Sequence, residues 1–313
     1  MKRTTRDYLL IVLKGIGMGA ADVVPGVSGG TIAFITGIYE ELIRSIKSIN
    51  LSSLKLLLKG ELSGFWEAIN GWFLVSVAAG IGISVLSLAK GLKFLLDHHP
   101  ILVWSFFFGL IIASAVYVAR DIKKWSFTTI LSVLIGIVIA YFITIVTPAS
   151  ANTNYSFVFL SGAIAICAMI LPGISGSFIL VLLGMYRFIL GALSDLNLPV
   201  IILFLAGALI GIVVFSNVLA WLLKRFYTQT IALLSGFMIG SLNKVWPWKK
   251  VVETFTDRHG EIKPLVEHNI LPSHYQAATG AAPLFTYAVI LVLAGFALIF
   301  VIEGLTKGLK KQK

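Results

Sequence analysis

The chain has 313 residues, of which 58% are hydrophobic and only 12% are charged. A soluble domain of this size carries about twice that share of charged residues, so we expect a polytopic α-helical membrane protein. The formal net charge is +11, but the basic residues lie between apolar segments, as in proteins that follow the positive-inside rule. They form no basic stripe with interleaved aromatic residues, which excludes nucleic acid as the expected partner.

The sequence offers little for metal or thiol chemistry. Its single cysteine, Cys167, excludes an intrachain disulfide and a cysteine cluster for metal, and it reads most simply as a small packing residue. The histidines fall in expected loops without metal-ligand spacing. We therefore expect no metal and no cofactor. These histidines are His98, His99, His259, His268 and His274.

The first half of the chain, residues 1–147, begins with two apolar segments that together occupy 8–46. Each is marginal for a membrane span, which needs about 20 residues. Because Pro25 and Gly26 separate them, we predict a re-entrant hairpin with its tip at this break. A polar, amphipathic stretch over 50–70 is expected to lie along the membrane interface. Three spans follow, at 71–89, 101–119 and 126–146.

A charge-free, turn-rich linker over 148–154 separates the halves, and residues 155–313 repeat the pattern. A second broken hairpin is predicted at 157–193. A polar extracytoplasmic loop is expected at 244–283, before the last span. The three spans of this half are predicted at 200–223, 230–243 and 284–302.

The two breaks correspond residue by residue. Each half then holds one hairpin and three spans, and since three is odd, the second half enters the membrane from the opposite side. We predict an all-α polytopic membrane protein of two inverted repeats, each a re-entrant broken-helix hairpin plus three transmembrane helices. The corresponding residues are Pro25, Gly26, Ser28, Gly29, Gly37 and Tyr39 with Pro172, Gly173, Ser175, Gly176, Gly184 and Tyr186.

The distribution of lysine and arginine gives the expected orientation. Basic residues gather in segment 1–6, after the first hairpin and at the C-terminal end, whereas the linker and segment 193–199 have none. The positive-inside rule then places both termini in the cytoplasm. We expect a multi-pass protein of the cytoplasmic (plasma or inner) membrane.

Helix breaks in an apolar chain leave backbone polar groups without partners. Hydrocarbon tolerates them only where they are buried in protein or line a wet cavity, and matching breaks in two halves point to a transporter's binding site. We expect the two tips to meet near the midplane, where helix N-termini and hydroxyls would bind an anion, most naturally a phosphate. The alternative is a pair of structural kinks with capping serines. The assigned residues are Pro25, Gly26, Ser28, Gly29, Gly30, Thr31, Pro172, Gly173, Ser175, Gly176 and Ser177.

Charged and aromatic residues near the breaks give further candidates. A carboxylate at Asp22 beside an anion pocket suggests coupling to H⁺ or Na⁺, since buried acids cost free energy. Equally, Asp22 would pair with Lys14 or cap freed N–H groups. Glu40 is a second coupling or gating candidate, with interfacial anchoring as the alternative. Candidate headgroup contacts, for each of which anchoring at the interface is the rival role, are Tyr39, Tyr186 and Arg120.

At these residues the chain resembles a known family. The run DVVPGVSGGT over 22–31, followed by GIYE over 37–40, is similar to the signature of the prokaryotic polyprenyl-phosphate transporter family PopT, and LPGISGS over 171–177 matches its second hairpin. The resemblance covers nearly the whole chain. It implies a transporter, not an enzyme, that returns undecaprenyl phosphate from the outer to the inner leaflet of the cytoplasmic membrane. This would recycle the lipid carrier for cell-wall and surface-glycan synthesis.

Two alternatives stay open. Integral-membrane undecaprenyl-diphosphate phosphatases also use inverted re-entrant hairpins and a similar Pro-Gly-x-Ser motif, in which an arginine follows the serine and grips phosphate. Here Gly29 and Gly176 stand in that place, and the glutamates and histidine expected for hydrolysis are missing at membrane depth. The other alternative is a carrier or channel for a small anion, which the sequence does not discriminate from a lipid transporter.

Overall fold

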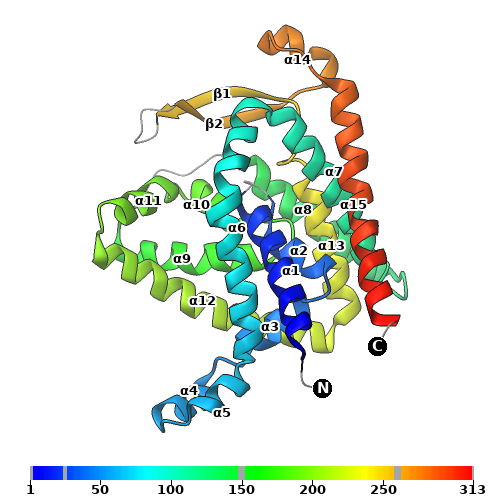
Figure 1. The fold of residues 1–313 in the computed structure, drawn as a ribbon. Helices are drawn as coiled ribbons and strands as arrows, with labels where there is room; N and C mark the ends of the chain where they lie inside the picture. Colours follow the sequence, from blue (N-terminus) through cyan, green and yellow to red (C-terminus); the bar gives the residue numbers. More distant parts are fainter. Residues whose placement is uncertain (1–2, 24–26, 147–151, 257–261, 312–313) are drawn as a thin grey trace.

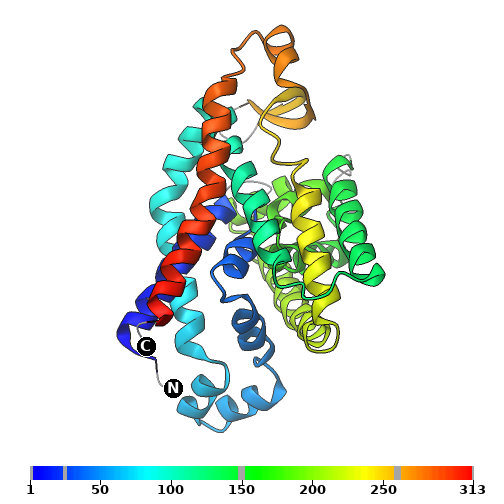
Figure 2. The same cartoon turned by 90° about the vertical axis from the view of Figure 1, so that its right-hand side faces the viewer.

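The computed structural model describes residues 3–23, 27–146, 152–256 and 262–311. Helices make up most of this part of the chain, and a β-hairpin extends from one end of the helical body (Figures 1 and 2). Both ends of the chain lie at the opposite end of the molecule (Figure 1).

Four helices of the described residues are long and apolar enough to cross a membrane, and a bent helix pair brings the number to five. The two helices of that pair, α10 and α11, meet at an angle of 112°. Only 17% of the apolar stretch of α8, and the same share of α12, is buried, so these helices present apolar surface outward, as lipid contact requires. The chain is a multi-pass membrane protein. The elements are α6 (Gly71–His98), α7 (Pro100–Ala119), α8 (Phe127–Ile145), α12 (Leu198–Arg225), α10 (Gly176–Leu182) and α11 (Tyr186–Ser194).

Each predicted hairpin folds as three helices rather than two. The extra break lies at a glycine with positive φ, Gly37 at 71° in the first hairpin and Gly184 at 68° in the second. Side chains disfavour this conformation, which glycine adopts readily. The second segment of each predicted hairpin is therefore divided into two short helices. The remaining elements of the hairpins are α1 (Thr5–Val23), α2 (Gly29–Ile35), α3 (Tyr39–Lys47) and α9 (Tyr155–Ile170).

The amphipathic stretch after the first hairpin forms two short helices, α4 (Leu51–Leu58) and α5 (Leu62–Ala68). The side chain of Asn50 starts α4 by accepting hydrogen bonds from the N–H groups of Ser52 and Ser53. Both helices lie away from the main helical body (Figure 1) and expose leucines to the surroundings. An apolar surface of this kind suits the membrane interface.

The segment over 244–283, which the sequence predicts as a polar loop, contains a small β-hairpin. It contains an antiparallel pair of strands, β1 (Lys249–Thr256) and β2 (Ile262–Asn269). The sequence of β1, KKVVETFT, is rich in β-branched residues, which favour strands. The overall polarity of 244–283 predicts a loop without regular structure. Around the strands lie α13 (Tyr227–Ser241), α14 (Pro272–Thr279) and α15 (Phe285–Lys311).

The long helices pack in pairs that correspond between the two halves. Helix α1 packs on α6 as α9 packs on α12, and α7 packs on α15 as α13 packs on α8. Helices α7 and α13 also contact each other. The last helix of each half thus pairs with a helix of the other half, so the halves interlock.

Glycines allow these helix pairs to approach closely. A Cβ atom on Gly109 of α7 would collide with the backbone oxygen of Val292 in α15, and one on Gly295 would collide with that of Phe106. Small residues at helix crossings are typical of membrane proteins, where close packing replaces the hydrophobic effect between helices. The other pairs are built in the same way, by Gly15 with Gly80, Gly136 with Gly236 and Gly162 with Gly207.

We expect Gly109→Val to destabilise the fold, since its side chain would push α7 from α15 at a cost of about 1–3 kcal/mol or more. The matched control is Gly82→Val, because a Cβ at Gly82 meets no atom within 4 Å. Thermal unfolding of the purified variants in detergent, followed by size-exclusion chromatography, measures the difference. Equal midpoints for the two variants would contradict the packing described for α7 and α15.

Candidate functional site

The two helix breaks lie against each other. The hydroxyl of Ser28 donates a hydrogen bond of 3.0 Å to the backbone oxygen of Met169, and the hydroxyl of Thr31 accepts one of 3.0 Å from the N–H of Gly173. Both side chains are fully buried. Residues about 140 positions apart in the sequence therefore satisfy each other's polar groups in the middle of an apolar protein. Pro25 and Gly26, assigned to the first break, lie outside the described residues.

The first break contains a carboxylate, that of Asp22, which is hydrogen-bonded within the chain. Oδ1 of Asp22 accepts a hydrogen bond of 2.7 Å from the N–H of Gly29, at the start of α2. The hydroxyl of Ser28 accepts from the N–H of Gly30 at 3.1 Å. The bond from Gly29 caps a freed N–H, which is one of the contacts expected for Asp22, and Lys14 donates to the backbone oxygen of Thr36 at 2.7 Å. Two of the N–H groups at the α2 terminus that lack helical partners are therefore satisfied within the chain.

Glycine is required on both sides of this contact. A Cβ on Gly29 would lie 2.5 Å from Oδ2 of Asp22, and one on Gly30 would lie 2.5 Å from the backbone oxygen of Ile170. The first contact keeps the carboxylate close to the helix terminus. The second lets α2 approach the end of α9, so that the two hairpins touch.

The second break is built differently. Its N-cap residue, Ser175, makes no side-chain cap hydrogen bond, and its hydroxyl lies 2.8 Å from that of Ser177. The position that corresponds to Asp22 is Met169, which has no charge. The start of α10 thus offers two neighbouring hydroxyls and no internal carboxylate in that position. Such a site suits an external anion better than the first break does.

Tight packing fixes the backbone around the second break. Gly173, which follows Pro172, has a φ of 85°, and a Cβ there would lie 2.9 Å from the hydroxyl oxygen of Ser241 in α13. A Cβ on Gly176 would lie 2.7 Å from the backbone oxygen of Ala165. The second break is therefore held between α9 and the C-terminal end of α13.

Two of the other candidates lie at a separate cavity. Glu40 lines a cavity of about 310 Å³ together with Tyr39, Arg44, Asp121 and Tyr227. Tyr39 itself is 2% exposed and packs on the ring of Phe34, and its hydroxyl has no hydrogen-bond partner among the described residues. Tyr39 and Glu40 therefore belong to this cavity.

The last two candidates are also separate from the hydrogen bonds between the breaks. The guanidinium of Arg120 lies over the ring of Phe300 in α15, 4.9 Å from its centre. This contact directs it toward α15 and suits an anchoring role. Tyr186 is partly buried at the first position of α11.

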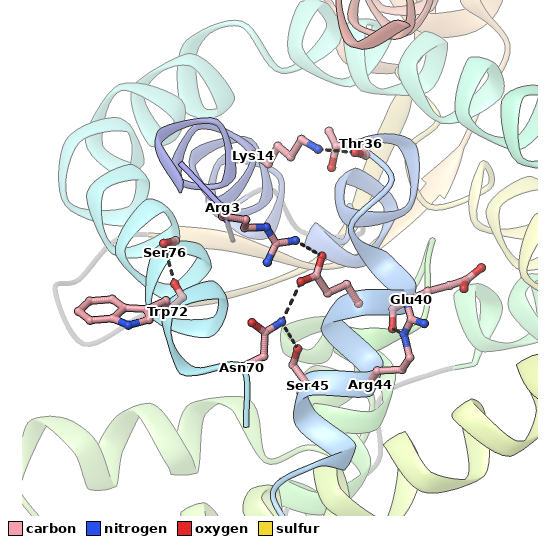
Figure 3. A network of polar contacts seen from close by, with 10 residues as sticks. Arg3, Lys14, Thr36, Glu40, Arg44, Ser45, Asn70, Trp72 and Ser76 are labelled. Atoms are coloured by element: carbon pink, nitrogen blue, oxygen red, sulfur yellow. Dashed lines mark hydrogen bonds and ion pairs between the residues drawn. The ribbon is translucent and has the colours of Figure 1, made fainter. Parts of the chain in front are cut away.

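A polar network that the sequence did not indicate braces the first hairpin. The carboxylate of Glu41 accepts from Arg3 at 2.6 Å and from Asn70 at 2.8 Å, and Asn70 also donates to the hydroxyl of Ser45 at 3.1 Å. Figure 3 shows this network, with Lys14 and Thr36 nearby. It ties the N-terminal segment, α3 and the start of α6 together. The described residues contain no group of three His, Cys, Asp or Glu side chains that could hold a metal ion.

Comparison with known proteins gives one consistent result. The family model described as VCA0040-like, undecaprenyl phosphate translocase-like matches residues 18–263. A polyprenyl-phosphate transporter of Vibrio cholerae serotype O1 is 46% identical over 303 residues, which cover 97% of this chain and 98% of the relative. A polyprenyl-phosphate transporter of Staphylococcus aureus is 34% identical over 254 residues, which cover 75% and 85%. No solved structure matches the chain. The chain therefore belongs to the VCA0040-like, undecaprenyl phosphate translocase-like family.

Proposed function

We propose that this protein translocates polyprenyl phosphate, with undecaprenyl phosphate as the expected form, across the cytoplasmic membrane. The net direction would be from the outer to the inner leaflet, which recycles the lipid carrier for cell-wall and surface-glycan synthesis. Two relatives of this chain are named polyprenyl-phosphate transporters. The observation that carries the proposal is the contact between two helix breaks inside a multi-pass membrane protein.

The lipid phosphate would bind at the second break. A phosphate brings strong acceptor oxygens, and the hydroxyls of Ser175 and Ser177, which lie 2.8 Å apart, can donate to it; Ser175 makes no side-chain cap bond to α10. Gly173 and Gly176 let the backbone come close. The hydrocarbon tail would remain in the bilayer beside the outward-facing apolar helices.

Asp22 would couple transport to H⁺ or Na⁺. Its carboxylate accepts from Gly29 at the first break, while the lipid phosphate would sit at the second break, which touches the first. Two anions so close in an apolar protein repel each other. A proton or a sodium ion on Asp22 would remove this repulsion and allow the lipid to enter. Glu40, which is exposed on its cavity, is a second candidate for ion coupling.

We also propose that the halves are inverted repeats, as the number of spans in each half implies. The corresponding helix pairs and the corresponding glycine contacts within them support this arrangement. An internal two-fold relation explains why the two breaks meet, since each half contributes one tip from an opposite side. Both ends of the chain at one end of the molecule (Figure 1) support cytoplasmic placement of both termini, in line with their basic residues.

Transport of polyprenyl phosphate in reconstituted liposomes tests the proposal. We expect the wild type to move the labelled lipid between leaflets, and Ser175→Ala with Ser177→Ala to slow this about tenfold or more. The reason is that hydrogen bonds to a charged group contribute about 1.5–3 kcal/mol each. The control is Ser87→Ala on α6, whose hydroxyl donates to its own helix at Ile83.

Three outcomes would overturn the proposal. One is a wild-type protein that leaves the lipid in its original leaflet. Release of inorganic phosphate from polyprenyl diphosphate would indicate a phosphatase instead. Flux of inorganic phosphate through liposomes that lack the lipid would indicate a carrier or channel for a small anion.

A second experiment tests the proposed role of the Asp22 carboxylate in ion coupling. We expect a gradient of H⁺ or Na⁺ to accelerate transport by the wild type, and Asp22→Asn to lose this acceleration, because the amide cannot exchange either ion. Asp97→Asn serves as the control, since Asp97 is exposed on α6. Rates with and without each gradient are measured in the same liposomes. If Asp22→Asn responds to the gradient as the wild type does, Asp22 has no coupling role.

A further inference from the structure

The cavity of about 310 Å³ that contains Glu40 lies beside the turn between α2 and α3, where Gly37 has its positive φ. Its wall is formed by the end of α2, the first turns of α3, the segment after α7 and the start of α13. Elements from both halves of the chain therefore meet at this cavity. The polar side chains that line it are Tyr39, Glu40, Glu41, Arg44, Asp121 and Tyr227.

The charges that line this cavity leave an excess of one negative charge. Glu41 is neutralised by Arg3, whose guanidinium lies 2.6 Å from its carboxylate. Of the other described residues that line the cavity, Glu40 and Asp121 are acidic and Arg44 is basic. Nε of Arg44 donates to the backbone oxygen of Glu40 at 3.3 Å, a contact within its own helix. One monovalent cation would balance the remaining charge.

The two carboxylates act on the same part of the cavity wall. Tyr227 precedes the predicted span at 230–243, and burial, followed by the charges of Glu40 and Asp121, raises the pKa of its hydroxyl to about 12. The neighbouring guanidinium of Arg120 is directed to the ring of Phe300. The field at this wall is therefore negative, which attracts a cation and repels a phosphate.

A buried hydroxyl gives independent evidence for a ligand. Tyr39 also lines the cavity, yet it is only 2% exposed, and its hydroxyl has no hydrogen-bond partner among the described residues. Its ring packs on that of Phe34, with 4.9 Å between the ring centres. A buried hydroxyl without a partner costs free energy, and native structures rarely contain one. A ligand in the cavity would supply the missing partner, since a hydroxyl oxygen has lone pairs to offer a cation.

We propose that this cavity binds Na⁺, with the carboxylates of Glu40 and Asp121 and the hydroxyl oxygen of Tyr39 as ligands. Oxygen ligands, and carboxylates above all, suit hard cations. As a second place for a coupling ion beside Asp22, the site rests on the proposed function. The cavity and the second break would then take opposite charges, the ion in one and the lipid phosphate in the other.

Binding of radiolabelled Na⁺ to the full-length protein in detergent, without lipid substrate, tests the proposal. All variants carry D22N, so that an ion at the first break does not contribute. In this background we expect E40Q and D121N each to weaken Na⁺ binding about tenfold, because affinity follows the charge of the ligands. We expect Y39F, which loses one oxygen ligand, to weaken it about threefold. The control is E67Q, since Glu67 is exposed on α5.

Y39F distinguishes a ligand from a hydroxyl that is merely buried. Removal of a hydroxyl that binds nothing leaves Na⁺ affinity unchanged, and that result would overturn the proposal. The proposal also fails if D22N alone binds no Na⁺, or if E40Q and D121N bind it as D22N does. Thermal unfolding in NaCl and in choline chloride of equal concentration identifies any variant that does not fold, in which case the remaining variants decide.

The same protein in liposomes separates this inference from the proposed function. A wild type that binds Na⁺ at this cavity but leaves polyprenyl phosphate in its original leaflet would contradict the proposed function and support the inference. A wild type that moves the lipid, while the variants show no loss of Na⁺ binding, would contradict the inference alone.

Discussion

The structure depends on one constraint, which is that backbone polar groups inside a membrane protein need partners. Two helices break in the middle of this apolar chain, and each break supplies what the other lacks. Ser28 donates to the backbone of Met169, and Thr31 accepts from the backbone of Gly173. Neither break would be tolerated alone in hydrocarbon. The interlocked helix pairs, closed by glycines such as Gly109 and Gly295, hold the two breaks together.

The two breaks look alike in sequence but differ in charge. The first contains a carboxylate that accepts from Gly29, and the second has paired hydroxyls and no carboxylate in the corresponding position. A symmetric pair of positive helix ends would bind an anion without any control over its entry. In the proposed mechanism the asymmetry would provide such control, because the charge on Asp22 would decide how readily a second anion enters. The proposed two-fold scaffold would in this way transport in a defined direction.

Much of the fold could be predicted from the sequence, because apolar length and Pro-Gly breaks report directly on the bilayer. The pairing of the breaks followed from their matching residues. The β-hairpin was not predicted, because the overall polarity of 244–283 indicates a loop even though β1 contains β-branched residues. The contacts of individual side chains could not be predicted from the sequence either. Arg120 lies over Phe300, Asp22 caps a helix, Lys14 donates to the backbone of Thr36, and the breaks at Gly37 and Gly184 depend on backbone torsion.

The central claim is that the lipid phosphate occupies the second break. A cryo-electron microscopy structure of the protein in nanodiscs with bound polyprenyl phosphate tests this most directly. The account predicts headgroup density within hydrogen-bond distance of the hydroxyls of Ser175 and Ser177. Headgroup density in the cavity lined by Glu40, Arg44 and Tyr227, with the second break unchanged, would contradict it.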